Sequence, residues 1–226
     1  MRRLVLFCEG QGDELGVWQL TKRVLAPSDP WRWLVLDDAP FRTGDVSSLF
    51  KSDFSKWLKL LTAARKRPEF AGVVAVFDGD MDRVNKQPFC PKLHACQLAA
   101  AAQSVGAGST FSLAVIFARQ EFESWLIAGV ESLAGQRLPP NSRPGVLSGT
   151  VAPSGDLELH PRGAKEWLSK AMEEGYLPTR DQGVLAKLVA LDPIRNRNLR
   201  SFSRFESAIV QIASAIQHNK HIATPS

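Results

Sequence analysis

"VVAVFDGDMD", residues 73–82, is an apolar run that changes abruptly into three closely spaced acids. A short, uninterrupted apolar run rich in valine is typical of a strand buried on both faces of a parallel sheet. Similar runs occur at residues 3–8, 31–37 and 111–118. The segments between them repeat apolar residues at spacings of three and four, which indicates helices. This alternation predicts an α/β fold with a mainly parallel, four-stranded sheet flanked by helices.

The helical period continues after the last predicted strand. Along the whole chain, the segments with this helical period are residues 13–25, 52–67, 91–105, 120–129, 161–175, 179–191 and 202–217. A stretch rich in Pro, Gly and Ser interrupts them, and residues that precede proline avoid the helical region. We therefore expect three parts: an α/β core over residues 1–135, an irregular loop over 136–160, and a helical C-terminal region over 161–226 that packs on the core.

Composition narrows the class of protein. The chain has 226 residues, 44% of them hydrophobic, which is enough for a buried core. No apolar run approaches the roughly 20 residues that span a bilayer, so we expect no membrane insertion. Three cysteines without a CxxC pair indicate neither a disulfide framework nor a zinc site, and they favour a reducing cytoplasm. The formal charge of +5 favours polyanionic partners.

Acidic residues follow three of the four predicted strands. They are Glu9 after the first strand, Asp78, Asp80 and Asp82 after the third, and Glu121 and Glu123 after the fourth. The carboxyl ends of parallel strands lie on one edge of a sheet, where ligands bind. We therefore expect these six acids to crowd one edge.

Such a cluster needs a compensating charge. Two carboxylates about 5 Å apart repel by roughly 3 kcal/mol at an effective dielectric constant of 20. A proton, a Lys or Arg partner, or a bound cation relieves that repulsion. Oxygen ligands alone select a hard ion, Mg²⁺ or Mn²⁺. Any single acid also suits a helix cap or a turn, as Asp13, Asp53 or Asp82 would, but the combination favours a metal cluster.

The glycines at positions 10, 12 and 16 allow a second interpretation. Their spacing is one residue longer than the GxGxxG dinucleotide fingerprint, and Asp37 or Asp38 lies about where a ribose-binding acid would. However, Asp13 and Glu14 would stand where a pyrophosphate should dock, and they would repel it. We expect instead that the glycines permit a tight turn that lets Glu9 face the metal.

A basic segment near the C-terminus is the other candidate site. "PIRNRNLRSFSR", residues 193–204, contains Arg195, Arg197, Arg200 and Arg204 and no acid. A charge run is commonly a solvated helix face, yet arginine is suited to bidentate phosphate contacts. These four arginines are therefore candidates for nucleic-acid binding. His94, between Cys90 and Cys96, is interpreted as an ordinary helix residue.

Several of these motifs carry a family resemblance. "CEGQGDE" (residues 8–14) followed by a strand that ends in "DGD" resembles the Toprim domain of topoisomerases, bacterial primases and OLD-family nucleases. With "QEFESWLIAG", "GYLPTRDQGVLAKL" and "RSFSRFESAI", the chain looks like a family of Toprim-like bacterial proteins of unknown function, often found beside ATPases in phage-defence neighbourhoods. The resemblance implies that Glu9 is the motif glutamate, that Asp78 and Asp80 are the DxD pair, and that Glu121 and Glu123 are the additional acids of the nuclease branch.

These observations combine into one functional hypothesis. The chain is expected to cleave phosphodiester bonds or transfer phosphoryl groups on nucleic acid, DNA rather than RNA, with Mg²⁺ or Mn²⁺. Glu9, Asp78 and Asp80 would be catalytic, and all six acids would be candidate metal ligands. The resemblance implies a role in phage defence with an ATPase encoded nearby. Two alternatives stay open: a non-catalytic Toprim-like regulatory subunit that binds a metal or nucleotide, and a Rossmann-like dinucleotide binder.

Overall fold

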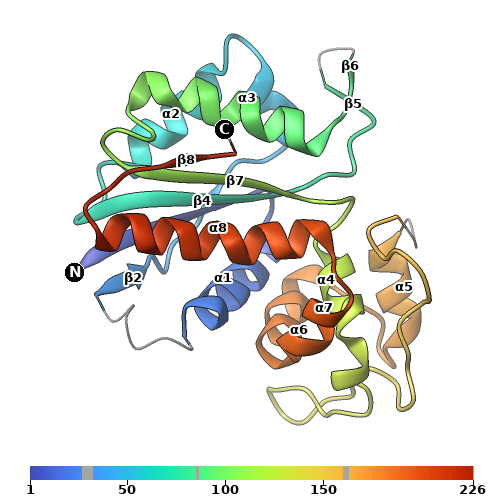
Figure 1. The fold of residues 1–226 in the computed structure, drawn as a ribbon. Coiled ribbons are helices and arrows are strands. Elements are labelled where there is room, and N and C mark those ends of the chain that lie inside the picture. Colours follow the sequence, from blue (N-terminus) through green and yellow to red (C-terminus); the bar gives the residue numbers. More distant parts are fainter. Residues whose placement is uncertain (27–32, 85–86, 160–162, 226) are drawn as a thin grey trace.

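The computed structural model describes residues 1–26, 33–84, 87–159 and 163–225 (Figure 1). Within these ranges the main sheet has six strands, and its neighbouring strands pair in parallel. The strands are β1 (Arg2–Cys8), β2 (Leu34–Leu36), β3 (Phe41–Arg42), β4 (Phe70–Asp78), β7 (Ser112–Ala118) and β8 (Ala223–Thr224). Their order is β2-β1-β4-β7-β8, with β3 beside the carboxyl end of β1. The α/β class and the mainly parallel sheet are thus confirmed.

The sheet contains more than the four strands expected. β3 and β8 have two residues each, so they are too short to show any periodicity in the sequence. β2 begins at Leu34, and the first two residues of the predicted strand 31–37 lie outside the described residues. Two further short strands, β5 (Arg83–Val84) and β6 (Gln87–Pro88), pair antiparallel apart from the main sheet.

Eight α-helices lie in the described parts of the chain. They are α1 (Gln11–Leu25), α2 (Ser55–Ala64), α3 (Pro91–Ala102), α4 (Glu123–Ala128), α5 (Ala164–Ala171), α6 (Gly183–Leu188), α7 (Leu191–Asn196) and α8 (Arg200–Gln217). Short 3₁₀ turns are η2 (Val46–Phe50), η3 (Gln103–Val105) and η4 (Val130–Ser132), and η5 (Pro178–Gln182) is a π-helical turn. No helix in the described ranges is long and apolar enough to cross a membrane.

The helices form a layer on each face of the sheet. Figure 1 shows α2 and α3 over one face and α1 and α8 over the other. Side chains alternate along β4 accordingly: Val73 and Ala75 join the core under α2 and α3, whereas Val74 packs towards α1 and α8. This alternation is the physical reason for the continuous apolar run, because both faces of the strand are buried.

The segments between β7 and α8 gather at one end of the sheet. α4, α5, α6 and α7 lie beyond the carboxyl ends of β4 and β7 (Figure 1). Residues 136–159 contain turns and two isolated bridges, at Leu138 and Val146, but no helix. This arrangement places a helical wall beside the sheet edge where the acids were expected.

Candidate functional site at the carboxyl end of the sheet

The carboxyl ends of three neighbouring strands carry the acids. Glu9 directly follows β1, and Asp78 is the last residue of β4. The parallel register pairs Asp78 with Ala118, so the segments after β4 and β7 leave the sheet side by side. The N–H of Gly79 donates to the carbonyl of Gln120 at 2.7 Å and joins the two segments. The register therefore brings Asp78 next to the segment that carries Glu121 and Glu123.

A lysine from α5 sits among these three acids. The Nζ of Lys165 lies 3.3 Å from Asp78 Oδ2, 3.1 Å from Glu121 Oε1 and 3.7 Å from Glu123 Oε2. The side chain of Glu123 is fully buried, while 36% of the Lys165 side chain is exposed. The ammonium group thus supplies the compensating positive charge that the cluster requires.

Backbone N–H groups hold two of the acids in place. Phe122 donates its N–H to Asp78 Oδ1 at 2.8 Å, and Ala164 donates to Glu121 Oε2 at 2.6 Å. Since each carboxylate also contacts Lys165 through its other oxygen, both oxygens of Asp78 and of Glu121 are engaged. These two side chains are fixed between the sheet edge and the N-terminus of α5.

Burial controls the protonation of the innermost acids. Burial raises the pKa of Glu123 to about 7, against the opposing effects of Lys165 and of the Tyr176 hydroxyl, which donates to Glu123 Oε1 at 3.0 Å. Burial also raises the pKa of Asp78, and the charges of Asp13 and Glu123 add to that shift. Burial would lower the pKa of Lys165, but Asp78, Glu123 and Glu121 together raise it. The lysine therefore stays charged.

Glu9 and Asp80 form a second, less compensated part of the edge. Burial raises the pKa of Glu9 from its ordinary value near 4.5 to about 7, and repulsion from Asp13, Asp80 and Asp45 adds to the rise. A backbone hydrogen bond from Val46 opposes it. Across the residues that the structure describes, neither Glu9 nor Asp80 has an ion-pair partner.

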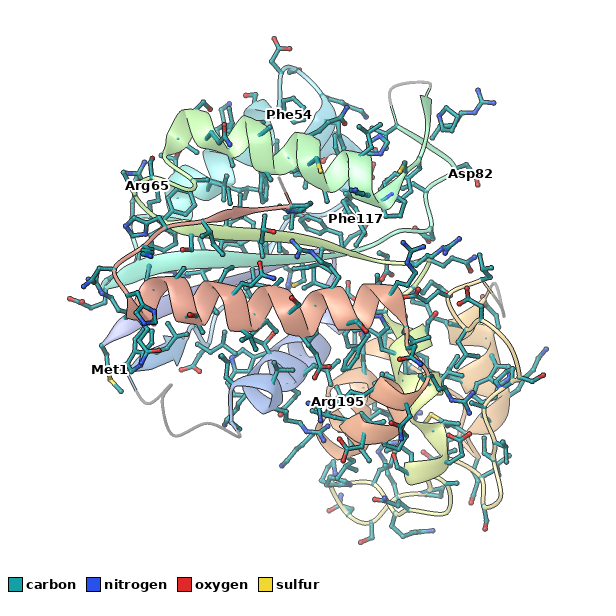
Figure 2. The ribbon with its side chains drawn as sticks, viewed as in Figure 1. Met1, Phe54, Arg65, Asp82, Phe117 and Arg195 are labelled. Atoms are coloured by element: carbon teal, nitrogen blue, oxygen red, sulfur yellow. The ribbon has the colours of Figure 1, made fainter. Side chains whose placement is uncertain are left out.

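The donors suit a hard divalent ion, but their arrangement does not yet form a metal centre. Carboxylate oxygens are the ligands that Mg²⁺ prefers. Among the described residues, however, no three Asp, Glu, His or Cys side chains form a group that could hold a metal ion. Asp82 lies at the base of the β5–β6 pair (Figure 2), where its carbonyl accepts the N–H of Phe89 at 3.0 Å. Asp82 therefore shapes this turn with its backbone.

The glycines of α1 have a role that differs from the one expected. Gly10 is extended, with φ −127°, and neither Gly12 nor Gly16 has a positive φ, so no tight turn requires them. Instead, a Cβ atom on Gly12 would lie 2.7 Å from both Gln182 Oε1 and Pro178 Cβ. The first turn of α1 is thus covered by η5, which leaves no room there for the pyrophosphate of a dinucleotide.

One of the two acids named for ribose binding, Asp37, is engaged elsewhere, whereas Asp38 is exposed. Asp37 is buried and pairs with Arg3 at 3.2 Å and with Arg67 at 3.7 Å. Glu14, in the first turn of α1, forms a bidentate pair with Arg42 at 2.6 and 2.8 Å. These contacts tie α1, β2 and β3 to the sheet.

The four candidate arginines separate into two pairs. Arg195 pairs with Glu206 and Asp192, each at 2.8 Å. Arg197 pairs with Glu131 at 2.7 Å and also donates to the carbonyl of Ala128 at 3.1 Å. Both therefore tie α7 to its neighbours (Figure 2 labels Arg195).

Arg200 and Arg204, the other pair, line a cavity beside the acidic edge.

The sequence analysis did not identify several residues around the acidic edge and this cavity. Lys165 and Tyr176 reach the acids from the region predicted as helical. No local pattern distinguishes Lys165, whereas Tyr176 is the one tyrosine of the chain and lies in the motif "GYLPTRDQGVLAKL" quoted above. Arg119 also lines the cavity, and it directly follows β7. Residues that follow parallel strands lie at the ligand-binding edge of a sheet, and this argument, which identified the acids, applies equally to Arg119.

Fold and site together define an α/β protein with a parallel sheet, an acidic carboxyl edge and a lysine that neutralises part of it. The chain belongs to a family described as a domain of unknown function (DUF4276), whose model matches residues 8–209. That match spans the acidic edge and both groups of arginines. No curated protein matches the chain, and no solved structure matches it.

Proposed function

We propose that the chain is a Toprim-like enzyme that cleaves phosphodiester bonds or transfers phosphoryl groups on nucleic acid. The observation that carries this proposal is the pair of acids Glu9 and Asp80, whose charges repel and have no cation partner in the described parts of the chain. An acid such as Glu9, with a raised pKa and no cation partner, is a mark of functional sites, because catalytic groups are commonly those whose pKa the surroundings shift.

Glu9, Asp78 and Asp80 would hold a divalent ion only after their side chains move closer together, because no three acids of the described residues form such a group in the present arrangement. When bound, Mg²⁺ or Mn²⁺ would polarise a phosphate and stabilise the leaving oxygen. Asp78 can join only if its contact with Lys165 opens, because both of its oxygens are engaged. Glu9, with a pKa of about 7, is suited to accept or release a proton near neutral pH. Lys165 would keep Glu121 and Glu123 neutralised.

The proposed substrate and partner rest on the resemblance, and the proposed compartment rests on the cysteines. The resemblance supports DNA as the substrate and an ATPase encoded nearby as a partner in phage defence. Cys8, Cys90 and Cys96 are free thiols, which supports a reducing compartment such as the cytoplasm.

A non-catalytic regulatory subunit is the second candidate. Lys165 favours it, because the ammonium group already compensates three of the six predicted metal ligands. In that case the acidic edge would bind a metal or nucleotide only to regulate a partner. The dinucleotide alternative has less support, since η5 covers the first turn of α1.

A cleavage assay separates the two candidates. Plasmid and single-stranded DNA would be incubated with Mg²⁺ or Mn²⁺, using the wild type, Asp80→Ala and the control Asp38→Ala, an exposed acid outside the site. We expect metal-dependent cleavage by the wild type and the control, and a loss of about 100-fold or more in Asp80→Ala, the scale seen when a group that stabilises the transition state is removed. Equal cleavage by Asp80→Ala would contradict the enzyme proposal. A wild type that shows no cleavage but a metal-dependent rise in melting temperature would support the regulatory subunit.

A further inference from the structure

A cavity of about 610 Å³ lies beside the acidic edge, between α3, β7, α8 and β8. This volume falls within the range of small-molecule binding sites. The cavity adjoins the carboxyl end of β7, near the labelled Phe117 (Figure 2). None of the six acids predicted as metal ligands lines it. The cavity is therefore a separate site next to the candidate catalytic edge.

Four cationic side chains from three elements converge on this cavity. Lys92 lies in the first turn of α3, Arg119 follows β7, and Arg200 and Arg204 lie in the first two turns of α8. Residues four apart share one face of a helix, so the two α8 arginines stand one above the other on the same wall. One cavity thus receives positive charge from both helix layers.

Most of this positive charge is not neutralised inside the molecule. In the ranges that the structure describes, Lys92, Arg119 and Arg200 have no ion-pair partner, and Arg204 donates to the hydroxyl of Thr224. Four cations and one acid, Glu158, line the cavity, which leaves a net charge of +3.

Glu158 offsets one of these four charges, but backbone N–H groups and not the cationic side chains engage its oxygens. Its side chain is buried, with 1% exposed, and it accepts the N–H groups of Arg200 at 3.0 Å and of Ser201 at 2.6 Å. The carboxylate therefore caps α8 and occupies the anion position at that helix N-terminus. A ligand anion would have to bind the guanidinium groups and not the backbone of α8.

The remaining wall is apolar. Ala95, Val115, Phe117 and Pro225 line it beside the cations. Such a wall would not be filled by an inorganic anion alone, but it suits the organic part of a larger molecule. The cavity volume lies in the range of sites that hold a single small molecule.

We infer that this cavity binds a nucleoside monophosphate group, with the phosphate on Arg119, Arg200 and Arg204 and the nucleoside against the apolar wall. A phosphomonoester carries a charge of about −1.5 to −2 at pH 7, which the excess positive charge matches. Arginine provides paired N–H donors for phosphate oxygens. The group has two possible sources, a free nucleotide or the phosphorylated end of a nucleic-acid strand. Only the second source rests on the proposed function.

Calorimetric titration in EDTA tests the inference without metal chemistry. The probes are AMP, adenosine, inorganic phosphate, and a hexanucleotide with either a 5′-phosphate or a 5′-hydroxyl. We expect AMP to bind at least tenfold more tightly than adenosine or phosphate. Arg119→Gln and Arg200→Gln should each weaken AMP binding about 10- to 100-fold, which is the effect of losing a charge-assisted hydrogen bond. Neither side chain has an ion pair within the described residues, so both variants should fold.

Two controls make the outcome decisive. Arg195→Gln removes a nearby arginine that does not line the cavity, and it should leave AMP binding unchanged. Asp80→Ala should also bind AMP normally, even if it loses cleavage, so failure of the enzyme proposal and failure of this inference are distinguishable. Preference for the 5′-phosphorylated hexanucleotide over its 5′-hydroxyl form would identify a strand end as the ligand. Binding of AMP alone would support the cavity and count against a strand end. Equal binding of AMP by the wild type and the Arg119→Gln/Arg200→Gln double variant, or no binding, would overturn the inference.

Discussion

At the scale of single residues, Lys165 decides the electrostatic state of the acidic edge. Its ammonium group lies within 4 Å of three carboxylates, one of them fully buried. Breaking a buried ion pair by removing one partner is strongly destabilising, because a buried charge is left uncompensated. The oxygens that lose the lysine would also become open to another cation.

We predict that Lys165→Met lowers stability and makes the protein more responsive to metal. The free energy of unfolding should fall by about 2 kcal/mol, less than the 3–5 kcal/mol of a fully buried pair because Lys165 is partly exposed. For a chain of this length that corresponds to a fall of about 4–8 °C in melting temperature. Added Mn²⁺ should recover part of the loss, since ions that bind the native state stabilise it. Lys170→Met, an exposed lysine on the same helix, is the control. Identical melting of the two variants in EDTA would refute the prediction.

Because of Glu9, the free energy of unfolding should fall as the pH rises towards 7. An acid whose pKa is lowered on folding has the opposite effect. The pKa of Glu9 is raised from near 4.5 to about 7, so the folded state binds the proton more tightly than the unfolded state does. This contribution to stability is complete below about pH 4.5 and is lost as the pH rises through 7. The melting temperature in EDTA should therefore decline between these pH values. Glu9→Gln should make the decline shallower without abolishing it, because Glu123, whose pKa is also raised to about 7, contributes over the same range. Since Glu9 is only partly buried, we expect an effect of about 1 kcal/mol. A wild-type profile that is already flat would contradict this.

At the scale of elements, two glycines of α1, Gly12 and Gly16, determine how closely α1 packs against the η5–α6 segment. A Cβ atom on Gly16 would lie 2.9 Å from Gln182 Cγ and 3.0 Å from the ring of Phe122. The helix can approach the segment this closely because Gly12 and Gly16 lack side chains. The same contact carries a hydrogen bond from Gln182 Nε2 to Asp13 at 3.1 Å, which links α1 to the acidic edge.

We predict that Gly16→Ala destabilises the protein even though alanine is the better helix former. Replacing glycine by alanine inside a helix ordinarily gains about 1 kcal/mol, whereas overpacking a core costs typically 1–3 kcal/mol. The net loss should be about 1 kcal/mol, measured by urea unfolding. Gly10→Ala is the matched control, because its added Cβ would lie 3.5 Å from the nearest atom and its backbone is extended. A Gly16→Ala variant as stable as Gly10→Ala would contradict this account of the glycines.

The sequence could predict those features of the elements that depend on local pattern. Buried parallel strands are continuous apolar runs, so β4 and β7 were expected, and the acids at their carboxyl ends followed from topology. The partners of those acids were not predictable, because Lys165 reaches Asp78 from 87 residues away along the chain. The role of Gly16 depends on which segment packs against α1. The arginine run contains two pairs, Arg195 with Arg197 and Arg200 with Arg204. Their surroundings differ only in the tertiary structure, so the sequence could not distinguish them.

At the scale of the whole molecule, one continuous core joins the sheet to the helices that follow it in the chain. The cluster on the α1 and α8 face includes Leu6 of β1, Trp125 of α4, Leu185 of α6 and Phe205 of α8. The ring of Trp125 lies 5.0 Å from that of Phe205. Helices packed in this way cannot leave the sheet without exposing the shared core, so they should unfold with it.

We predict a single cooperative unfolding transition for the full chain. Tryptophan fluorescence reports on Trp125 in this core and on Trp57 in the core of the opposite face, while far-ultraviolet circular dichroism reports on all helices. The two signals should give coincident urea curves, which is the test of two-state behaviour. An early transition that alters only one signal would contradict the prediction and show that part of the molecule unfolds separately.

The position of β8 has a consequence for how the protein is made on the ribosome. Ala223 pairs with Leu113, so β7 cannot pair with β8 until the chain has been synthesised through β8. During that interval Leu113 and Ala114, the residues of β7 that pair with β8, lack this partner, and such an edge invites pairing with other nascent chains. Translation that pauses before residue 222 would prolong this exposure. Chaperones that cover unpaired strands should therefore matter more for the yield of this protein than its folded stability suggests.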